Sequence, residues 1–181
     1  KKGVLKAAKK SSRDAAEGLI ILGEDKNSIN LTEINSETDF VAKNVEFKNF
    51  CKKISEVSIK ANNLDDLNNI KIDGAVIKDL IVNLVSKIGE NIKLKIFKKI
   101  LKENLKMSFY VHNKVDDNMG KIISVLKYNS KINESAQLAS NICMHIAAMS
   151  PMALNENNLE NNFINKEKKI IEKKIDKSGK K

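Results

Sequence analysis

Two hydrophobic periods alternate along this chain, and their alternation is what most constrains the fold. Residues 18–22 form a short continuous apolar run that is typical of a β-strand, and turn-forming residues follow at 23–27. Residues 40–57 instead carry apolar side chains at the three- and four-residue spacing of a helix. Strand signals followed by helix signals occur twice. This order predicts an α+β chain built on antiparallel hairpins.

Spacing and turn residues assign the individual elements. Strands are expected at 18–22, 29–36, 92–96, 107–112 and 121–128, and helices at 40–57, 74–87, 133–149 and 165–177. Thr38 or Asp39 is expected to cap the first of these helices, and Gly89 to end the second. Residues 62–69 are expected to form a loop. Pro151 should end the third helix, whose predicted buried residues are Leu138, Ile142, Ile146 and Met149.

This succession predicts two related subdomains, each a small antiparallel sheet packed with helices, followed by the start of a helical protrusion. The expected boundaries are 1–14 for a linker or helix end, 15–104 and 105–160 for the subdomains, and 161–181 for the first part of a coiled-coil helix. The chain starts without Met and without an apolar signal region. We therefore expect it to be the middle of a longer protein.

The net charge of +10 suggests a polyanionic partner, but the residue types argue against nucleic acid. Arg13 is the only arginine, whereas nucleic-acid readers use the bidentate arginine fork. Aromatic residues, on which bases stack, make up 4% of the chain. A solvated lysine surface is the favoured interpretation. The alternative is a basic RNA-binding or ribosome-associated protein, and strong salt dependence of RNA binding would mark it.

The sequence contains little that could perform catalysis. It has no GxGxxG or Walker pattern, so no direct nucleotide binding is expected. His112 and His145 are the only histidines; neither has an evident nucleophile, and His145 is expected to be a packed or capped structural residue. Cys51 and Cys143 lack metal-type spacing and are expected to be small buried hydrophobes. We predict no cofactor, no metal, no membrane span and no enzyme activity.

One segment, residues 33–44, is unusual because a phenylalanine stands directly at a predicted helix start. It reads Glu-Ile-Asn-Ser-Glu-Thr-Asp-Phe-Val-Ala-Lys-Asn. In one interpretation Thr38 or Asp39 caps the helix and Phe40 packs against it in a staple-like contact. In the other, Asp39 and Phe40 protrude together and anchor a partner, since an exposed aromatic beside a charge is a plausible binding hot spot.

This segment resembles the signature of the elongation factor Ts family. Other segments resemble that family in the same order along nearly the whole chain: 6–10 with 15–20, 87–92, 108–112 and 144–151. By resemblance, the chain would be a core region that lacks the family's N-terminal helical domain and most of its coiled-coil and C-terminal regions. The turn at 113–120, after the histidine strand, is longer than in many relatives.

The resemblance implies a function in translation elongation without side-chain chemistry. Such a chain would bind the GTPase elongation factor Tu in its GDP-bound and nucleotide-free forms, and promote GDP release by disturbing its magnesium and phosphate site. The partner-binding residues carried over by position are Thr38, Asp39, Phe40, Val41, Ile88, Gly89 and His112. Phe40 would be the wedge and Asp39 its polar neighbour. The expected location is the bacterial cytoplasm, or an organelle matrix or stroma if the gene is nuclear.

Overall fold

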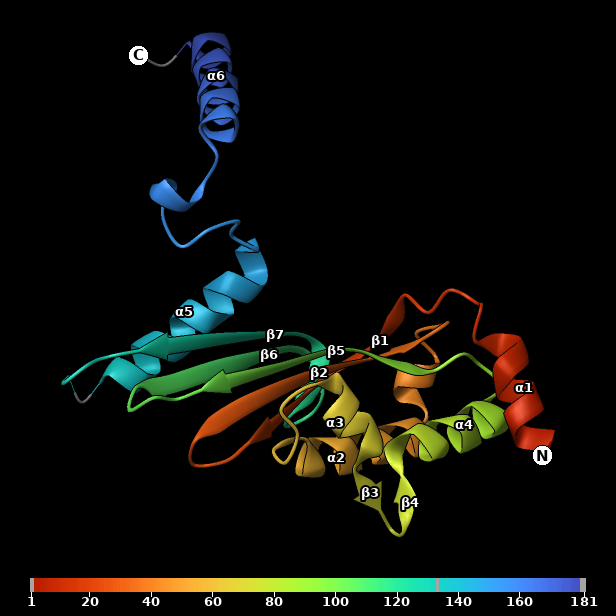
Figure 1. Cartoon of the computed structure of the whole chain (residues 1–181). Coiled ribbons are helices and arrows are strands. Elements are labelled where there is room, and N and C mark those ends of the chain that lie inside the picture. The colour runs from red at the N-terminus through yellow and green to blue at the C-terminus, as the bar shows by residue number, and fades with distance from the viewer. Residues whose placement is uncertain (1, 133, 180–181) are drawn as a thin grey trace. The chain divides into compact units, whose positions relative to one another are not determined.

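The computed structural model describes residues 2–132 and 134–179, which belong to two units (Figure 1). The first unit, Lys1–Ala147, contains a β-sheet with helices on it. The second, Ala148–Lys181, contains the short 3-10 helix η2 (Glu156–Asn158) and helix α6 (Asn161–Ser178). Four residues of the predicted segments 1–14, 133–149 and 161–181 lie outside the described part of the chain, namely residues 1, 133, 180 and 181.

The sheet of the first unit has five strands in the order β5-β2-β1-β7-β6, and every neighbouring pair is antiparallel. The strands are β1 (Glu17–Glu24), β2 (Ser28–Ser36), β5 (Lys93–Leu101), β6 (Lys106–Asp116) and β7 (Met119–Tyr128). The α+β class is therefore confirmed. We expected a separate sheet in each of two subdomains, but the strands of both predicted halves join in this one sheet.

The junction between the two halves of the sheet is short. Strands β1 and β2 pair over their whole length, from Glu17↔Ser36 to Glu24↔Ile29. Strands β1 and β7 pair only at Ile20↔Gly120 and Ile21↔Met119. One further hydrogen bond runs from the Leu22 amide to the Asn118 carbonyl, at 2.8 Å. Because this seam is short, the two halves are each held more firmly within themselves than to one another.

Strand β2 lies inside the sheet and is largely buried on both faces; only Leu31 and Glu33 are half-buried, and its other residues are buried. This explains why its sequence lacks a clean two-residue alternation. Asn30 and Thr32 are fully buried although they are polar, and the Asn30 side-chain amide donates to the Ser58 carbonyl at 2.6 Å. A strand that is paired on both edges and covered on both faces has no solvent face to mark with polar residues.

Helices α2 (Val45–Ser58), α3 (Leu64–Asn69) and α4 (Ile77–Ile88) lie on one side of the sheet (Figure 1). They enclose the main core with β1 and β2; its largest fully buried side chain is Phe47. Helix α1 (Lys2–Lys10) packs beside α4. Cys51 is 0% exposed, as is Cys143, so the prediction that both are buried is confirmed, and burial raises the pKa of the Cys51 thiol.

Three local predictions differ from the structure. Helix α2 begins at Val45, because the Asn44 side chain accepts from the amides of Glu46 (2.8 Å) and Phe47 (3.2 Å); Thr38 and Asp39 do not cap it. The predicted loop at 62–69 contains α3, which Asn63 caps. The predicted helix at 74–87 begins only at Ile77, since β3 (Lys71–Ile72) and β4 (Ala75–Val76) form a hairpin before it.

Helix α5 (Ser135–Met149) buries a different face from the one predicted. Leu138, Ile142 and Met149 are 62%, 39% and 65% exposed, Ile146 is half-buried, and His145 is exposed. The buried residues are instead Ser135, Ala139, Cys143 and Ala147. These small residues face the sheet, where the Ser124 hydroxyl on β7 donates to the Cys143 carbonyl at 2.6 Å. The helix lies on the opposite side of the sheet from α2 (Figure 1).

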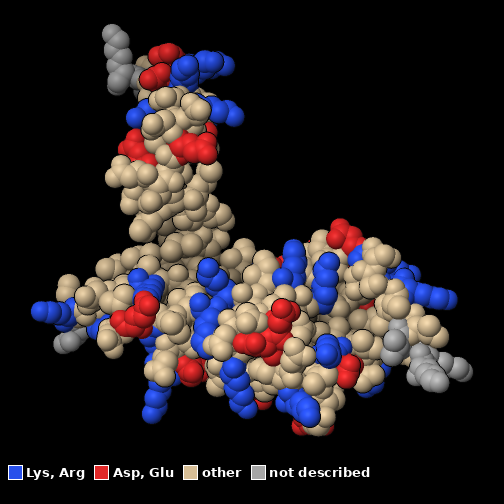
Figure 2. Space-filling view, viewed as in Figure 1, with Lys and Arg blue, Asp and Glu red and all other residues tan. Residues whose placement is uncertain are grey.

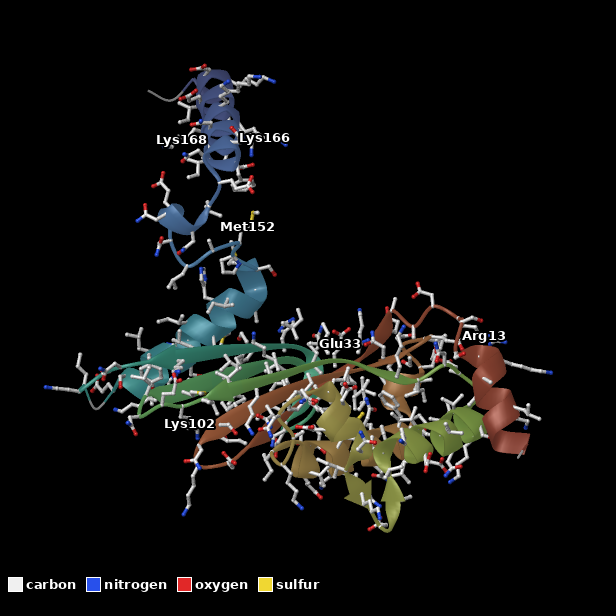
Figure 3. All side chains as sticks on the ribbon, viewed as in Figure 1. Arg13, Glu33, Lys102, Met152, Lys166 and Lys168 are labelled. Atoms are coloured by element: carbon white, nitrogen blue, oxygen red, sulfur yellow. The ribbon has the colours of Figure 1, made fainter. Side chains whose placement is uncertain are left out.

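Charged residues of both signs are interspersed over the face of the first unit shown in Figure 2. In the second unit, Lys166 and Lys168 are placed on α6 (Figure 3), and Lys168 lies 3.5 Å from Glu156. Of the isoleucines of α6, Ile164 is half-buried, and Ile170, Ile171 and Ile175 are exposed. No helix in the described part of the chain combines the length and the apolar character that crossing a membrane requires.

Gly18 provides a test of the pairing between β1 and β2. Its φ is +134°, and a Cβ built there would lie 2.0 Å from the Ile34 carbonyl oxygen. We expect Gly18→Ala to lower the free energy of unfolding by about 2 kcal/mol or more, because it combines backbone strain with a clash against the neighbouring strand. Urea unfolding followed by circular dichroism measures this change.

The matched control is Gly3→Ala in α1, where a new Cβ would lie 3.5 Å from the Ser86 hydroxyl, an ordinary contact. This change should be neutral or stabilising by up to about 1 kcal/mol, because alanine favours a helix more than glycine does. Equal stability of the two variants would contradict the tight β1–β2 register.

Candidate partner-binding site at the end of strand β2

The unusual segment forms a short projection, which we call the tip loop (residues 37–40). It begins where β2 ends at Ser36 and ends where the 3-10 helix η1 (Val41–Lys43) begins. The Phe40 side chain is 74% exposed and Asp39 is also exposed. Val41, in contrast, is 4% exposed and belongs to the core. The chain thus leaves the core after Ser36 and returns to it at Val41, with Phe40 in solvent between them.

Phe40 does not make the staple-like contact that one interpretation of the sequence proposed. Its neighbour is the Lys43 ammonium, 5.9 Å from the ring centroid. Lys43 also lies 3.9 Å from the Asp39 carboxylate, and both of these side chains are exposed. Exposed ion pairs of this kind contribute little stability. The surface of the tip is therefore an exposed aromatic ring flanked by charges that are free to rearrange around a partner.

The tip loop is held by what we call the cap segment (residues 88–91), which begins at Ile88, the last residue of α4. Gly89 has φ 90° and its amide donates to the Val85 carbonyl at 2.9 Å, so it ends the helix as predicted. The next residue, Glu90, accepts two hydrogen bonds from Thr38. The Thr38 amide lies 2.9 Å from one carboxylate oxygen, and the Thr38 hydroxyl lies 2.6 Å from the other.

A second set of contacts joins the tip loop, the cap segment and the connection between α1 and β1. The Asn91 amide donates to the Glu37 carboxylate at 2.6 Å. The Asn91 side chain, in turn, donates to the Arg13 carbonyl at 2.7 Å. The Arg13 guanidinium lies 3.4 Å from Glu37. Arg13 itself is seen on the connection that leaves α1 (Figure 3). Lys10 donates to the Gly89 carbonyl, so α1 also contacts the cap segment.

The electrostatics of this cluster favour an ionised Glu37. The hydrogen bond from the Asn91 amide lowers the pKa of the Glu37 carboxyl below its ordinary value, and the Arg13 guanidinium acts in the same direction. The carboxylate is thereby kept as an acceptor at neutral pH.

His112 is separate from the tip loop. It lies on β6, and β7 and β1 stand between β6 and β2. The paired residues Lys114, Gly120, Ile20 and Glu33 form a row across these four strands. His112 is two residues from that row, toward the sheet end at which the tip loop starts. It is half-buried and its ring lies 6.1 Å from that of Tyr110.

The structure thus brings Thr38, Asp39, Phe40 and Val41 together with Ile88 and Gly89, through the two hydrogen bonds to Glu90. Val41 and Ile88 are buried and half-buried, so their surfaces available to a partner are small. Sequence reasoning missed Glu37, Glu90 and Asn91. All three stand inside the segments that carried the family resemblance, but no periodicity or motif chemistry indicates that they contact one another.

A family model described as "Elongation factor TS" matches residues 37–181, so the match begins at the first residue of the tip loop. The chain belongs to the elongation factor Ts family. Both the tip loop and the cap segment lie inside the matched residues.

Curated relatives support the assignment. Elongation factor Ts of Rhodopseudomonas palustris (strain BisA53) is 38% identical over 99% of this chain and 60% of its own length. That of Dinoroseobacter shibae is 37% identical, over 93% of the chain and 56% of the relative. That of Ehrlichia canis is 37% identical, over 98% of the chain and 64% of the relative. The chain therefore spans about 60% of the length of the elongation factor Ts proteins that it matches.

The exposure of Phe40 gives a stability prediction. We expect Phe40→Ala to change the free energy of unfolding by less than about 0.5 kcal/mol, because the ring is already in solvent. The matched control is Phe47→Ala, which removes a fully buried ring and should cost about 3–5 kcal/mol. Guanidinium unfolding of both variants measures the difference. A large loss in Phe40→Ala would mean that the ring packs against the protein.

The lowered pKa of Glu37 gives a pH prediction. Because the folded-state pKa lies below the unfolded-state value of about 4.3, the stabilising contribution is fully present above that pH. It is lost as the pH falls through the folded-state pKa. The stability difference between the parent and Glu37→Gln should therefore shrink on acidification below about pH 4.3. Urea unfolding across pH 3–7 measures it, with Glu56→Gln on exposed α2 surface as control; a constant difference would refute the assignment.

Proposed function

We propose that this chain acts as a guanine-nucleotide exchange factor for elongation factor Tu in translation elongation. Membership of the elongation factor Ts family supports the partner and the activity. The observation that carries the proposal is the Phe40 side chain, 74% exposed yet held on a short loop between two buried residues, Ser36 and Val41. An exposed aromatic ring on a fixed support suits insertion into a partner.

In the proposed mechanism the chain performs no side-chain catalysis. Phe40 inserts into the GTP-binding domain of the partner near its magnesium and phosphate site, and Asp39 is its polar neighbour there. Gly89, Ile88 and His112 face the same partner. Thr38 and Val41 orient the loop from either end. Elements that hold the magnesium ion are displaced, and the phosphates of GDP lose its coordination.

Linkage explains how binding alone speeds nucleotide release. If the chain binds nucleotide-free partner more tightly than GDP-bound partner, GDP binding must weaken by the same factor. A preference of about 3–4 kcal/mol corresponds to a few hundredfold in affinity. Loss of magnesium coordination to the phosphates is a sufficient source for such a preference. The same reciprocity lets GTP displace the exchange factor afterwards.

The wider organisation of the chain fits this proposal. Residues 15–104 supply the tip loop and the cap segment, while 105–160 supply His112, and we propose that they act as two related subdomains on one partner. Residues 161–181 would begin a helical protrusion. The compartment would be the one in which the partner works, either the bacterial cytoplasm or an organelle matrix or stroma. Nucleic-acid binding is not needed for this mechanism.

Release of a fluorescent GDP analogue from purified elongation factor Tu tests the proposal. The 181-residue chain should accelerate release, and Phe40→Ala should lower the second-order rate constant for release by about thirtyfold or more, since an aromatic hot spot contributes about 2 kcal/mol or more. Asp39→Ala should show a smaller loss. No acceleration by the parent chain in tenfold excess would refute the proposal for this chain.

The matched control is Leu101→Ala. Leu101 is also an exposed apolar residue, 49% exposed, but its partner on β2 is Ser28, at the opposite end of that strand from the tip loop. The variant should release GDP at the parent rate. An equal loss in Leu101→Ala and Phe40→Ala would show that exposed apolar area in general, and not the tip, drives release.

A further inference from the structure

The tip loop has anchors at both ends, and between them it is held at Glu37 by the Asn91 amide and at Thr38 by the Glu90 carboxylate. Upstream, Ser36 is fully buried at the end of β2, and downstream Val41 returns to the core. Of the residues in between, Thr38 is held by Glu90 through both its amide (2.9 Å) and its hydroxyl (2.6 Å). The Thr38 carbonyl also accepts from the Ser36 hydroxyl at 3.0 Å. Phe40 stands two residues beyond this clamp.

Glu90 is itself firmly placed. It follows Gly89, whose left-handed backbone turns the chain at the end of α4. It precedes Asn91, which is 5% exposed and donates to the Glu37 carboxylate and to the carbonyl oxygens of Ser11 and Arg13. The cap segment is therefore bound to α4, to the tip loop and to the α1–β1 connection. A side chain that projects from such a segment is a fixed point for the loop that it binds.

We propose that Glu90 is a positioning residue for the tip: its carboxylate fixes Thr38, and through Thr38 it sets the direction in which Phe40 projects. Its effect on nucleotide exchange rests on the proposed function. A carboxylate that accepts two hydrogen bonds forms stronger bonds than a neutral acceptor, and its two oxygens define one orientation of the donor residue. A loop held in its bound conformation loses less conformational freedom on binding, so the ring engages its partner at lower cost.

Two alternatives make different predictions. If Glu90 touches the partner directly, its loss and the loss of Thr38 should add, because the two contacts would then be independent. If Glu90 only stabilises the fold, its loss should affect the core as well as the loop. In the positioning role the two residues act as a unit, and the effect of losing either is confined to residues 37–40.

The first experiment measures the loop itself, in the absence of any partner. Backbone ¹⁵N relaxation and amide hydrogen exchange are compared for the parent chain, Glu90→Ala and Glu46→Ala. Glu46→Ala is the matched control, because this carboxylate also reaches from the start of α2 to α4, where it lies 3.5 Å from Lys87, without contacting the tip loop. We expect residues 38–40 to become mobile only in Glu90→Ala, with the Thr38 amide exchanging at least about tenfold faster. An unchanged loop would overturn the proposal.

The second experiment is a double-mutant cycle on GDP release from elongation factor Tu. Glu90→Ala and Thr38→Val should each lower the second-order rate constant for release about tenfold, and the double variant should be no slower than either. Glu90→Gln retains a neutral acceptor and should lose only about threefold. Glu46→Ala should release GDP at the parent rate. Additive losses would overturn the proposal in favour of a direct contact between Glu90 and the partner.

The two readouts separate failure of this inference from failure of the proposed function. If the parent chain does not accelerate release, the exchange function fails, and the loop dynamics still decide whether Glu90 holds the tip. If the parent accelerates release while Glu90→Ala matches it in both rate and loop dynamics, the positioning role fails and the exchange function stands.

Discussion

The pairing of β2 on both of its edges is the constraint from which the rest of the structure follows. The strand pairs with β1 from Glu17↔Ser36 onward and with β5 from Ser28↔Leu101 to Asn35↔Lys93. A strand held in this way cannot shift its register without breaking hydrogen bonds on two sides. Ser36, its last residue, is consequently a fixed point. The loop that starts there begins from a defined position and direction.

The tip loop turns that fixed point into a surface feature. The exposed Phe40 ring contributes little to the stability of the fold. A loop that is already held in one conformation loses less conformational entropy when its ring binds a partner. The support comes from segments far apart in the chain: the cap segment after α4 and the α1–β1 connection that carries Arg13. Two segments that are distant in the sequence therefore converge on residues 37–40. The proposed exchange function needs binding alone, and this support would hold Phe40 in position before a partner binds.

The two sides of the sheet are packed by different rules. On one side, α2 and α4 bury large residues such as Phe47 and Leu84 in the main core. On the other side, α5 contacts β7 through small residues and leaves Leu138 and Met149 exposed. A helix with apolar residues on more than one face offers two stripes for burial, and hydrophobicity alone does not select between them. The small stripe is the one that faces the sheet, where the Ser124 hydroxyl donates to the Cys143 carbonyl.

Much of this protein can be derived from its sequence, and the remainder has a common physical cause. Local patterns determined the α+β class, the approximate positions of the strands, the end of α4 at Gly89 and the segment that holds Phe40, because these depend on periodicity and on residues close in the chain. The tertiary structure decided that one sheet contains all five long strands, that Asn44 and not Thr38 caps α2, and that α5 buries its small residues. It also decided that Thr38 is bound to Glu90, which lies 52 positions away in the sequence. Contacts over such separations leave no periodic pattern in the sequence, because the two residues become neighbours only in the folded chain.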